Sequence, residues 1–168
     1  MNLIVDDYKS MLRYFNYSGF KLFLIFLRMQ FWVTILIRLK TTRNRFALPL
    51  VILSDLILSI IFGIEVARTC SIGGGLLIPH PRNIILGATS IGKDCLIMTN
   101  VVLGASTPDP ENNVHKRPKI GNGVLIGTGA VIIGSVKVGD FCVIGANATV
   151  YRSIPDGSKV LSTSKVVE

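Results

Sequence analysis

The stretch from Ile120 to Val150, IGNGVLIGTGAVIIGSVKVGDFCVIGANATV, decides the fold of this chain. An aliphatic residue returns at every sixth position, namely Ile120, Ile126, Ile132, Val138, Ile144 and Val150. A short fixed period indicates a solenoid, in which each repeat buries its apolar side chain against the equivalent side chain of the next coil. An α-helix has 3.6 residues per turn and does not keep such a register.

The same period extends towards the N-terminus. Its aliphatic positions there are Val66, Ile72, Ile78, Ile85, Ile91, Ile97 and Leu103. A glycine often follows the aliphatic residue and permits close backbone approach at a tight corner. We therefore predict one short strand and one corner for each unit, with three units in each triangular coil. The fold class expected is mainly β, a parallel β-helix solenoid preceded by a short helical region.

The three cysteines fit this pattern as core residues. Cys70, Cys95 and Cys142 each stand four positions after a core aliphatic residue. Three cysteines cannot all pair, and their spacing matches no metal site. We expect small buried hydrophobic side chains, no covalent acyl-enzyme and no bound metal.

Composition divides the chain near residue 62. Residues 1–60 hold eight Lys or Arg against three Asp, a charge of +5, whereas residues 61–168 hold ten against seven, a charge of +3. Most glycines lie after residue 62. We predict a basic, apolar helical region at 1–62, a β-helix domain at 63–160 with a loop at 104–118, and a C-terminal tail at 161–168.

Two apolar stretches in the first part, Gly19–Lys40 and Phe46–Ile64, are predicted to form helices. The first carries charges that a membrane span does not tolerate, and the second has Asp55 at its centre. The pair is expected to pack on itself, on partner subunits or on a membrane interface. No nucleic-acid motif is present, and the absence of a signal peptide favours a cytoplasmic location, open to contact with the inner face of the membrane.

The repeat is interrupted twice, and the two histidines of the chain stand at the two breaks. His80 lies in the segment between Ile78 and Ile85, and His115 lies in the polar loop at 104–118. Loops on a rigid scaffold often carry catalytic residues. His80 is a candidate general base because an imidazole can take up a proton near neutral pH. Glu65, fifteen residues earlier, is placed to orient that imidazole.

These features resemble the hexapeptide-repeat acyltransferases, and within them the serine acetyltransferase branch. The segments that carry the resemblance are 63–66, 101–105, 117–121 and 126–134. The resemblance implies a left-handed β-helix and an acetyl-CoA-dependent O-acetyltransferase. It also implies a homotrimer, with helices able to join two trimers. In that branch an aspartate matches Glu65 and a histidine matches His80.

The resemblance further implies where acetyl-CoA binds. Its pantetheine arm is expected along a groove between two β-helices, against the backbone of small residues after core positions. These are Gly104, Ala105, Gly127, Thr128, Gly129, Ala130, Gly145 and Ala146. A backbone N–H near Ala105 is the candidate donor to the oxyanion. Each position is equally compatible with an ordinary corner of the repeat.

The sequence departs from the branch around the acceptor. Lys116 stands where an arginine grips the carboxylate of serine, Arg117 replaces a histidine, and His115 is displaced by two positions. Arg82, Lys116 and Arg117 are the candidate acceptor-binding residues, and His115 is either catalytic or an exposed loop residue.

These departures favour a sugar hydroxyl of a surface polysaccharide, or of its precursor, as the acceptor. Serine O-acetylation in cysteine biosynthesis is the alternative enzyme activity. A catalytically inactive scaffold is the alternative of another class. The expected partners are thus a small hydroxyl compound or glycan, further copies of the chain, and a membrane surface, without nucleic acid.

Overall fold

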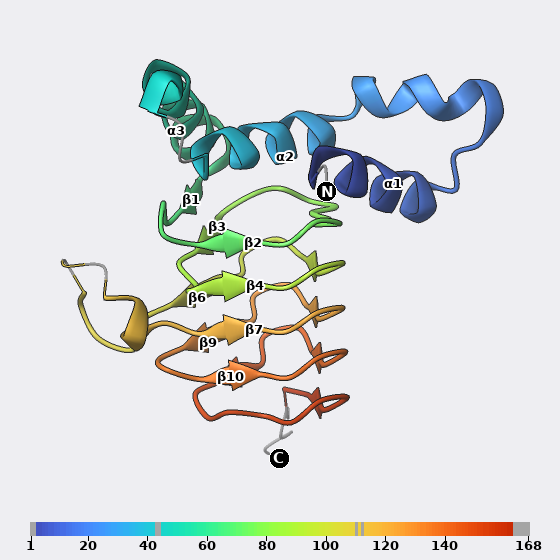
Figure 1. The fold of residues 1–168 in the computed structure, drawn as a ribbon. Helices are drawn as coiled ribbons and strands as arrows, with labels where there is room; N and C mark the ends of the chain where they lie inside the picture. Colours follow the sequence, from blue (N-terminus) through green and yellow to red (C-terminus); the bar gives the residue numbers. More distant parts are fainter. Residues whose placement is uncertain (1–2, 43–44, 110, 112, 163–168) are drawn as a thin grey trace, which may run out of the picture.

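The computed structural model describes residues 3–42, 45–109, 111 and 113–162. It shows a column of parallel β-strand coils with a layer of helices on one end (Figure 1). The chain leaves the helices, descends the column coil by coil, and ends at the far end. The predicted tail lies mainly at 163–168, outside the described residues.

Three parallel sheets form the three faces of the column. Sheet A has the order β1-β3-β6-β9-β12, sheet B the order β10-β7-β4-β2, and sheet C the order β13-β11-β8-β5. The strands of sheet A are β1 Ile64–Val66, β3 Ile84–Leu86, β6 Val102–Gly104, β9 Val131–Ile133 and β12 Thr149–Val150. Those of sheet B are β2 Ser71–Ile72, β4 Ser90–Ile91, β7 Lys119–Ile120 and β10 Lys137–Val138. Those of sheet C are β5 Leu96–Ile97, β8 Leu125–Ile126, β11 Val143–Ile144 and β13 Lys159–Val160.

The register stacks equivalent residues of successive coils. Leu103 pairs with Ile132, and Ile91 pairs with Ile120, as the six-residue period predicts. These side chains are nearly or fully buried and belong to one continuous hydrophobic cluster inside the column. Burying each one contributes roughly 1.5–3 kcal/mol, so the stack is the main source of stability.

One position of the predicted core is wrong. Ile85 is 37% exposed, whereas its neighbours Ile84 and Leu86 are fully buried. Leu86 pairs with both Val66 and Leu103, so Leu86 and not Ile85 holds the repeat position. The corner before β3 therefore contains one residue more than the simple count suggests, with Asn83 in the left-handed region at φ 53°. Ile85 points outwards as a result.

The helical region contains more elements than the two predicted. They are α1 Leu3–Phe15, the 3-10 helix η1 Gly19–Leu27, α2 Met29–Lys40, the 3-10 turn η2 Arg45–Ala47 and α3 Leu48–Phe62. The prediction of one helix over Gly19–Lys40 is wrong, because Arg28 is extended (φ −87°, ψ 128°) and separates η1 from α2. α3 ends at Phe62 and is capped by Gly63, whose φ of 64° an L-residue rarely adopts, and β1 follows at once.

The helices α2 and α3 close the upper end of the column. Val33 and Ile37 of α2 and Leu58 of α3 are fully buried and join the hydrophobic cluster of the β-helix. Without this layer the first coil would expose its core to water. The helical region is thus part of the hydrophobic core, and it positions α3 beside sheet A (Figure 1).

A buried ion pair fastens α1 and α2 to the first coil. Asp7 of α1 accepts hydrogen bonds from Arg38 Nε and Nη2 of α2, each 2.8 Å long. The same carboxylate accepts from the backbone N–H groups of Gly75 (2.8 Å) and Leu76 (2.9 Å). Arg38 in turn donates to the carbonyl oxygens of Ile72 and Gly73. Both buried charged groups therefore form hydrogen bonds inside the protein, which offsets the cost of removing them from water.

Within the described residues, no single helix is both long and apolar enough to cross a membrane. Lys21–Leu27 together with Met29–Lys40 reach the required length and composition, but the two helices are bent by 63°.

Candidate active site

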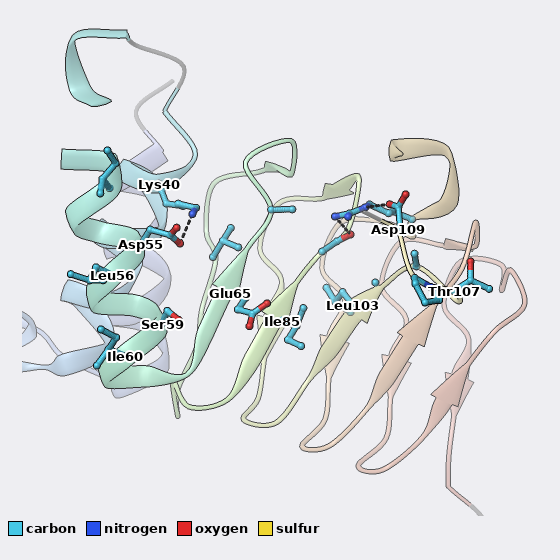
Figure 2. A pocket seen from close by; sticks show the side chains of 18 residues that line it. Lys40, Asp55, Leu56, Ser59, Ile60, Glu65, Ile85, Leu103, Thr107 and Asp109 are labelled. Carbon is cyan, nitrogen blue, oxygen red and sulfur yellow. Dashed lines mark hydrogen bonds and ion pairs between the residues drawn. The ribbon is translucent and has the colours of Figure 1, made fainter. Parts of the chain in front are cut away.

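A large cavity lies between α3, sheet A and the loop that follows β6. Its volume is about 970 Å³, within the usual range for ligand sites. Strands β1, β3 and β6 form its floor, the loop residues 105–109 form one wall, and α3 with the last residue of α2 forms the other (Figure 2). This cavity brings together residues of the helical region, of sheet A and of the loop between β6 and β7.

Glu65 lies on the floor of the cavity. It is the outward-facing residue of β1 and pairs across the sheet with Ile85 of β3 (Figure 2). Ile85, which points outwards instead of into the core, thus supplies an apolar surface beside the Glu65 carboxylate. Within the described residues no hydrogen bond or ion pair holds the Glu65 side chain, so it is available to a ligand or to a neighbouring imidazole.

The loop wall is held by a second buried ion pair. Asp109 accepts from Arg117 Nε at 3.1 Å, and both side chains are at most 10% exposed. Asp109 also accepts from the backbone N–H of Asn113 at 3.0 Å. That hydrogen bond, and then the guanidinium of Arg117, hold the pKa of Asp109 below its usual value. Arg117 Nη1 reaches the carbonyl oxygen of Gly87, which ties the loop to sheet A.

Acidification is expected to release this loop. Because the pKa of Asp109 is lowered in the folded state, its contribution is complete above the unfolded value near 4 and is lost as pH falls through the lower folded value. Amide exchange of residues 105–117, corrected for intrinsic rates, should therefore rise only in acid. Asp109→Asn should show the fast exchange already at pH 7, with no further rise in acid. Equal exchange in both proteins at pH 7 would contradict this.

His80 stands at the corner between sheets C and A, four residues before β3. Its turn is fixed from both sides, because Gln30 Nε2 donates to the carbonyl oxygen of Pro79 and Arg82 Nη1 donates to that of Ile61. The His80 side chain is exposed and does not line the cavity that contains Glu65. Since β3 pairs directly with β1, the two residues belong to adjacent coils at the same end of the column.

The other candidate acceptor residues lie apart from each other. Arg82 stacks over the ring of Phe62 at 5.6 Å, at the base of α3. His115 and Lys116 lie in the 3-10 helix η3 Val114–Lys116 and are exposed, outside the cavity. Of the three residues 115–117, only Arg117 lines the cavity, and Asp109 already engages its guanidinium.

The candidate coenzyme positions fall at two kinds of corner. Gly104 is the last residue of β6, Ala105 follows it, and both line the cavity. Gly127–Ala130 and Gly145–Ala146 form the corners that lead from sheet C into sheet A one and two coils further down. A side chain built on Gly104 would meet no atom within 4 Å, so this glycine leaves open space for a ligand.

Gly127, in contrast, is required by the close packing of neighbouring coils. A Cβ there would lie 2.6 Å from the backbone nitrogen of Ala146 in the next coil. We expect Gly127→Ala to destabilise the β-helix by about 1–3 kcal/mol through overpacking. Gly104→Ala, the matched control, should change stability by less than about 0.5 kcal/mol. Urea unfolding, followed by circular dichroism, measures the free energy of unfolding of both variants. Equal values would contradict the prediction, because the two coils would then have moved apart to accept the added methyl group.

The cysteines are buried and free, as predicted. Burial raises the pKa of Cys70 to about 12 and that of Cys95 to about 11, so neither thiol ionises near neutral pH. Within the part of the chain that the structure describes, no group of three or more His, Cys, Asp or Glu residues could hold a metal ion.

Sequence reasoning missed the helical wall of the cavity. Lys40 at the end of α2 and Asp55 of α3 form an ion pair there, and Ser59 lies one turn further along α3 (Figure 2). The sequence did contain a signal for this wall, because Asp55 is the one charged residue of the apolar α3. That charge indicated that α3 is a poor membrane span, but it did not indicate that Lys40 is its ion-pair partner.

Comparison with known proteins finds similar sequences and folds. Residues 117–152 match the family described as bacterial transferase hexapeptide, six repeats. The chain is 38% identical over 104 residues to a serine acetyltransferase of Helicobacter pylori, a stretch covering 61% of this chain and 59% of that protein.

Two solved structures share the fold. One is the Neisseria gonorrhoeae serine acetyltransferase in complex with serine, with a TM-score of 0.78, 23% identity and coverage of 96% of this chain and 66% of that one. The other is a serine acetyltransferase complex with CoA, with a TM-score of 0.78, 24% identity and coverage of 95% and 66%. The left-handed parallel β-helix is thereby confirmed, as is the resemblance to the serine acetyltransferase branch. The chain spans about three fifths of its Helicobacter relative.

Proposed function

We propose that this chain is an acetyl-CoA-dependent O-acetyltransferase that transfers an acetyl group to a hydroxyl acceptor. The observation that carries the proposal is the 38% identity to a serine acetyltransferase over 104 residues. The cavity on sheet A supports it, because it combines an unpaired carboxylate, Glu65, with an open glycine, Gly104. The inactive-scaffold alternative does not account for that cavity.

The reaction needs one base and one oxyanion site. His80 takes the proton of the acceptor hydroxyl as its oxygen attacks the thioester carbonyl, and Glu65 orients the imidazole. The predicted oxyanion donor, a backbone N–H near Ala105, follows the C-terminal end of β6, whereas His80 precedes the N-terminal end of the paired strand β3, so the two do not meet at one carbonyl within a single chain. When the carbon–sulfur bond breaks, His80 returns the proton to the departing thiolate, so the products are the O-acetyl ester and CoA. No enzyme nucleophile is used, in keeping with the buried cysteines.

Serine is the acceptor that the relatives favour, in place of the sugar favoured by the sequence alone. The Helicobacter protein is a serine acetyltransferase, and the Neisseria enzyme was solved in complex with serine. A sugar hydroxyl is the second candidate, because Arg117 is committed to Asp109 and Lys116 lies outside the cavity. Arg117 is therefore not free to hold the carboxylate of serine, and Lys116 is not placed to reach it in the cavity.

Assembly and location follow from the same proposal. We expect a homotrimer, with acetyl-CoA in the groove between two β-helices and Gly127–Ala130 and Gly145–Ala146 along it. Exposed apolar residues on the column, such as Phe141 (70%) and Tyr151 (65%), are candidates for subunit contacts. A cytoplasmic enzyme is expected, and contact of the helical layer with a membrane would rest on its exposed aromatic residues, among them Phe23 and Trp32.

An acceptor panel tests the proposal. Release of CoA from acetyl-CoA is followed with a thiol reagent in the presence of L-serine, neutral sugars and polyols, and the products are identified by mass spectrometry. Turnover of serine above all sugars supports the first candidate, and the reverse order supports the second. If no hydroxyl compound is acetylated above the rate of thioester hydrolysis, the proposed function is wrong.

A further inference from the structure

The helical wall of the cavity presents polar groups to the floor. In Figure 2, Lys40, Asp55 and Ser59 lie on the side of α3 that faces β1, opposite Glu65, whereas Leu56 and Ile60 project to the other side. Ile52, Leu56 and Ile60 also line the cavity, and the exposed residues of α3 other than Ser59 are apolar. Asp55 and Ser59 are therefore the two polar residues that α3 presents to the cavity.

The ion pair in this wall is asymmetric. The side chain of Lys40 is 9% exposed, and that of Asp55 is 49% exposed. A buried lysine needs a carboxylate partner, which Asp55 supplies through Oδ1. About half of the Asp55 side chain is thus accessible to solvent, and Asp55 lines the cavity. Ser59 is exposed as well, and within the described residues its hydroxyl has no hydrogen-bond partner.

The charged groups around the cavity are mostly paired. Among the described residues, its ionisable lining consists of two cations, Lys40 and Arg117, and three carboxylates, Asp55, Glu65 and Asp109. Lys40 is paired with Asp55 and Arg117 with Asp109. Carboxylate oxygens accept hydrogen bonds, so this lining is suited to hydrogen-bond donors.

We propose that Asp55 and Ser59, supported by Lys40, form the acceptor-binding wall and select acceptors by neutral or cationic hydrogen-bond donors. The inference rests on the proposed function and deepens it. Asp55 accepts hydrogen bonds from an ammonium or hydroxyl group of the acceptor, and Ser59 donates to or accepts from a second polar group. The acceptor is then held between α3 and Glu65, with its reactive hydroxyl towards the end of sheet A that bears His80.

The test compares kinetic constants of matched variants of the full chain. Asp55→Asn should raise KM for the acceptor roughly 10–100-fold, because a hydrogen bond to a charged group is lost, and Ser59→Ala roughly 3–10-fold. The value of kcat and the KM for acetyl-CoA should change less than about twofold. Asp94→Asn, which also removes an ion pair but one that lies outside the cavity, and Ser71→Ala, an exposed serine outside the cavity, are the controls.

The dependence of kcat/KM on the charge of the acceptor shows whether Asp55 binds the acceptor or only supports the structure. Asp55→Asn leaves Lys40 without its counter-charge, so kcat/KM for L-serine relative to L-serine methyl ester should rise. A loss confined to ammonium-bearing acceptors identifies the ammonium as the ligand, and a loss with neutral methyl glycosides identifies hydroxyls. Ser59→Ala breaks no ion pair and remains informative if Asp55→Asn folds poorly.

The inference is overturned if both variants keep the acceptor KM of their controls, or if kcat falls while KM does not. If the wild-type chain acetylates no acceptor of the panel, the proposed function fails, and the inference fails with it. If the wild type is active and the variants match their controls, the inference alone fails.

Discussion

Replacement of His80 by alanine is expected to lower kcat for acetyl transfer by roughly 10²–10⁴-fold. The loss follows because the acceptor hydroxyl would have to give its proton to water as it attacks the thioester. The KM for acetyl-CoA should stay within about twofold, since the candidate coenzyme positions lie at other corners. Stopped assays of CoA release at saturating substrates measure the effect.

Two further variants test whether the loss is specific to His80 as the general base. Glu65→Gln should cost less than His80→Ala, because it removes only orientation and charge support for the imidazole. His115→Ala separates the two histidines: the side chain is exposed in η3, outside the cavity, and its loss should be small. Near-normal turnover by His80→Ala, or a trapped acetyl-cysteine, would refute the mechanism. A larger loss in His115→Ala than in His80→Ala would transfer the role of base to His115.

The second large effect is expected in stability. Arg38→Met leaves the carboxylate of Asp7 buried without its cation, and should destabilise the docking of the helices by about 3–5 kcal/mol. The chain has one tryptophan, Trp32 in α2, so its fluorescence during urea unfolding reports on the helical layer. Circular dichroism of the strands reports on the column separately.

Arg13→Met is the matched control. It removes the Arg13–Asp94 ion pair, which also joins the helices to the column but whose side chains are 71% and 60% exposed. Water screens such a pair, so less than about 1 kcal/mol should be lost. Replacing both buried partners by apolar residues, Asp7→Leu with Arg38→Met, should recover part of the stability. If Arg38→Met resembles Arg13→Met, the buried pair does not hold the helical layer.

The sequence predicted most of the β-helix but little of the candidate active site. The period of six predicted coils, core and loop, and failed only at Ile85, where a corner residue moves the register. Three of the candidate residues that it nominated, Glu65, Gly104 and Ala105, line one cavity. The roles of the fourteen candidate residues stay predictions until variants are assayed.

The sequence by itself determined the coiled strands, because a residue that must stack on its equivalent leaves a mark at a fixed distance along the chain. Contacts between elements leave no such mark. The pairing of Asp7 with Arg38, of Lys40 with Asp55 and of Asp109 with Arg117 depends on how helices and loop dock on the column. Only the tertiary structure therefore decided that the helical region closes the end of the β-helix and completes the cavity on sheet A.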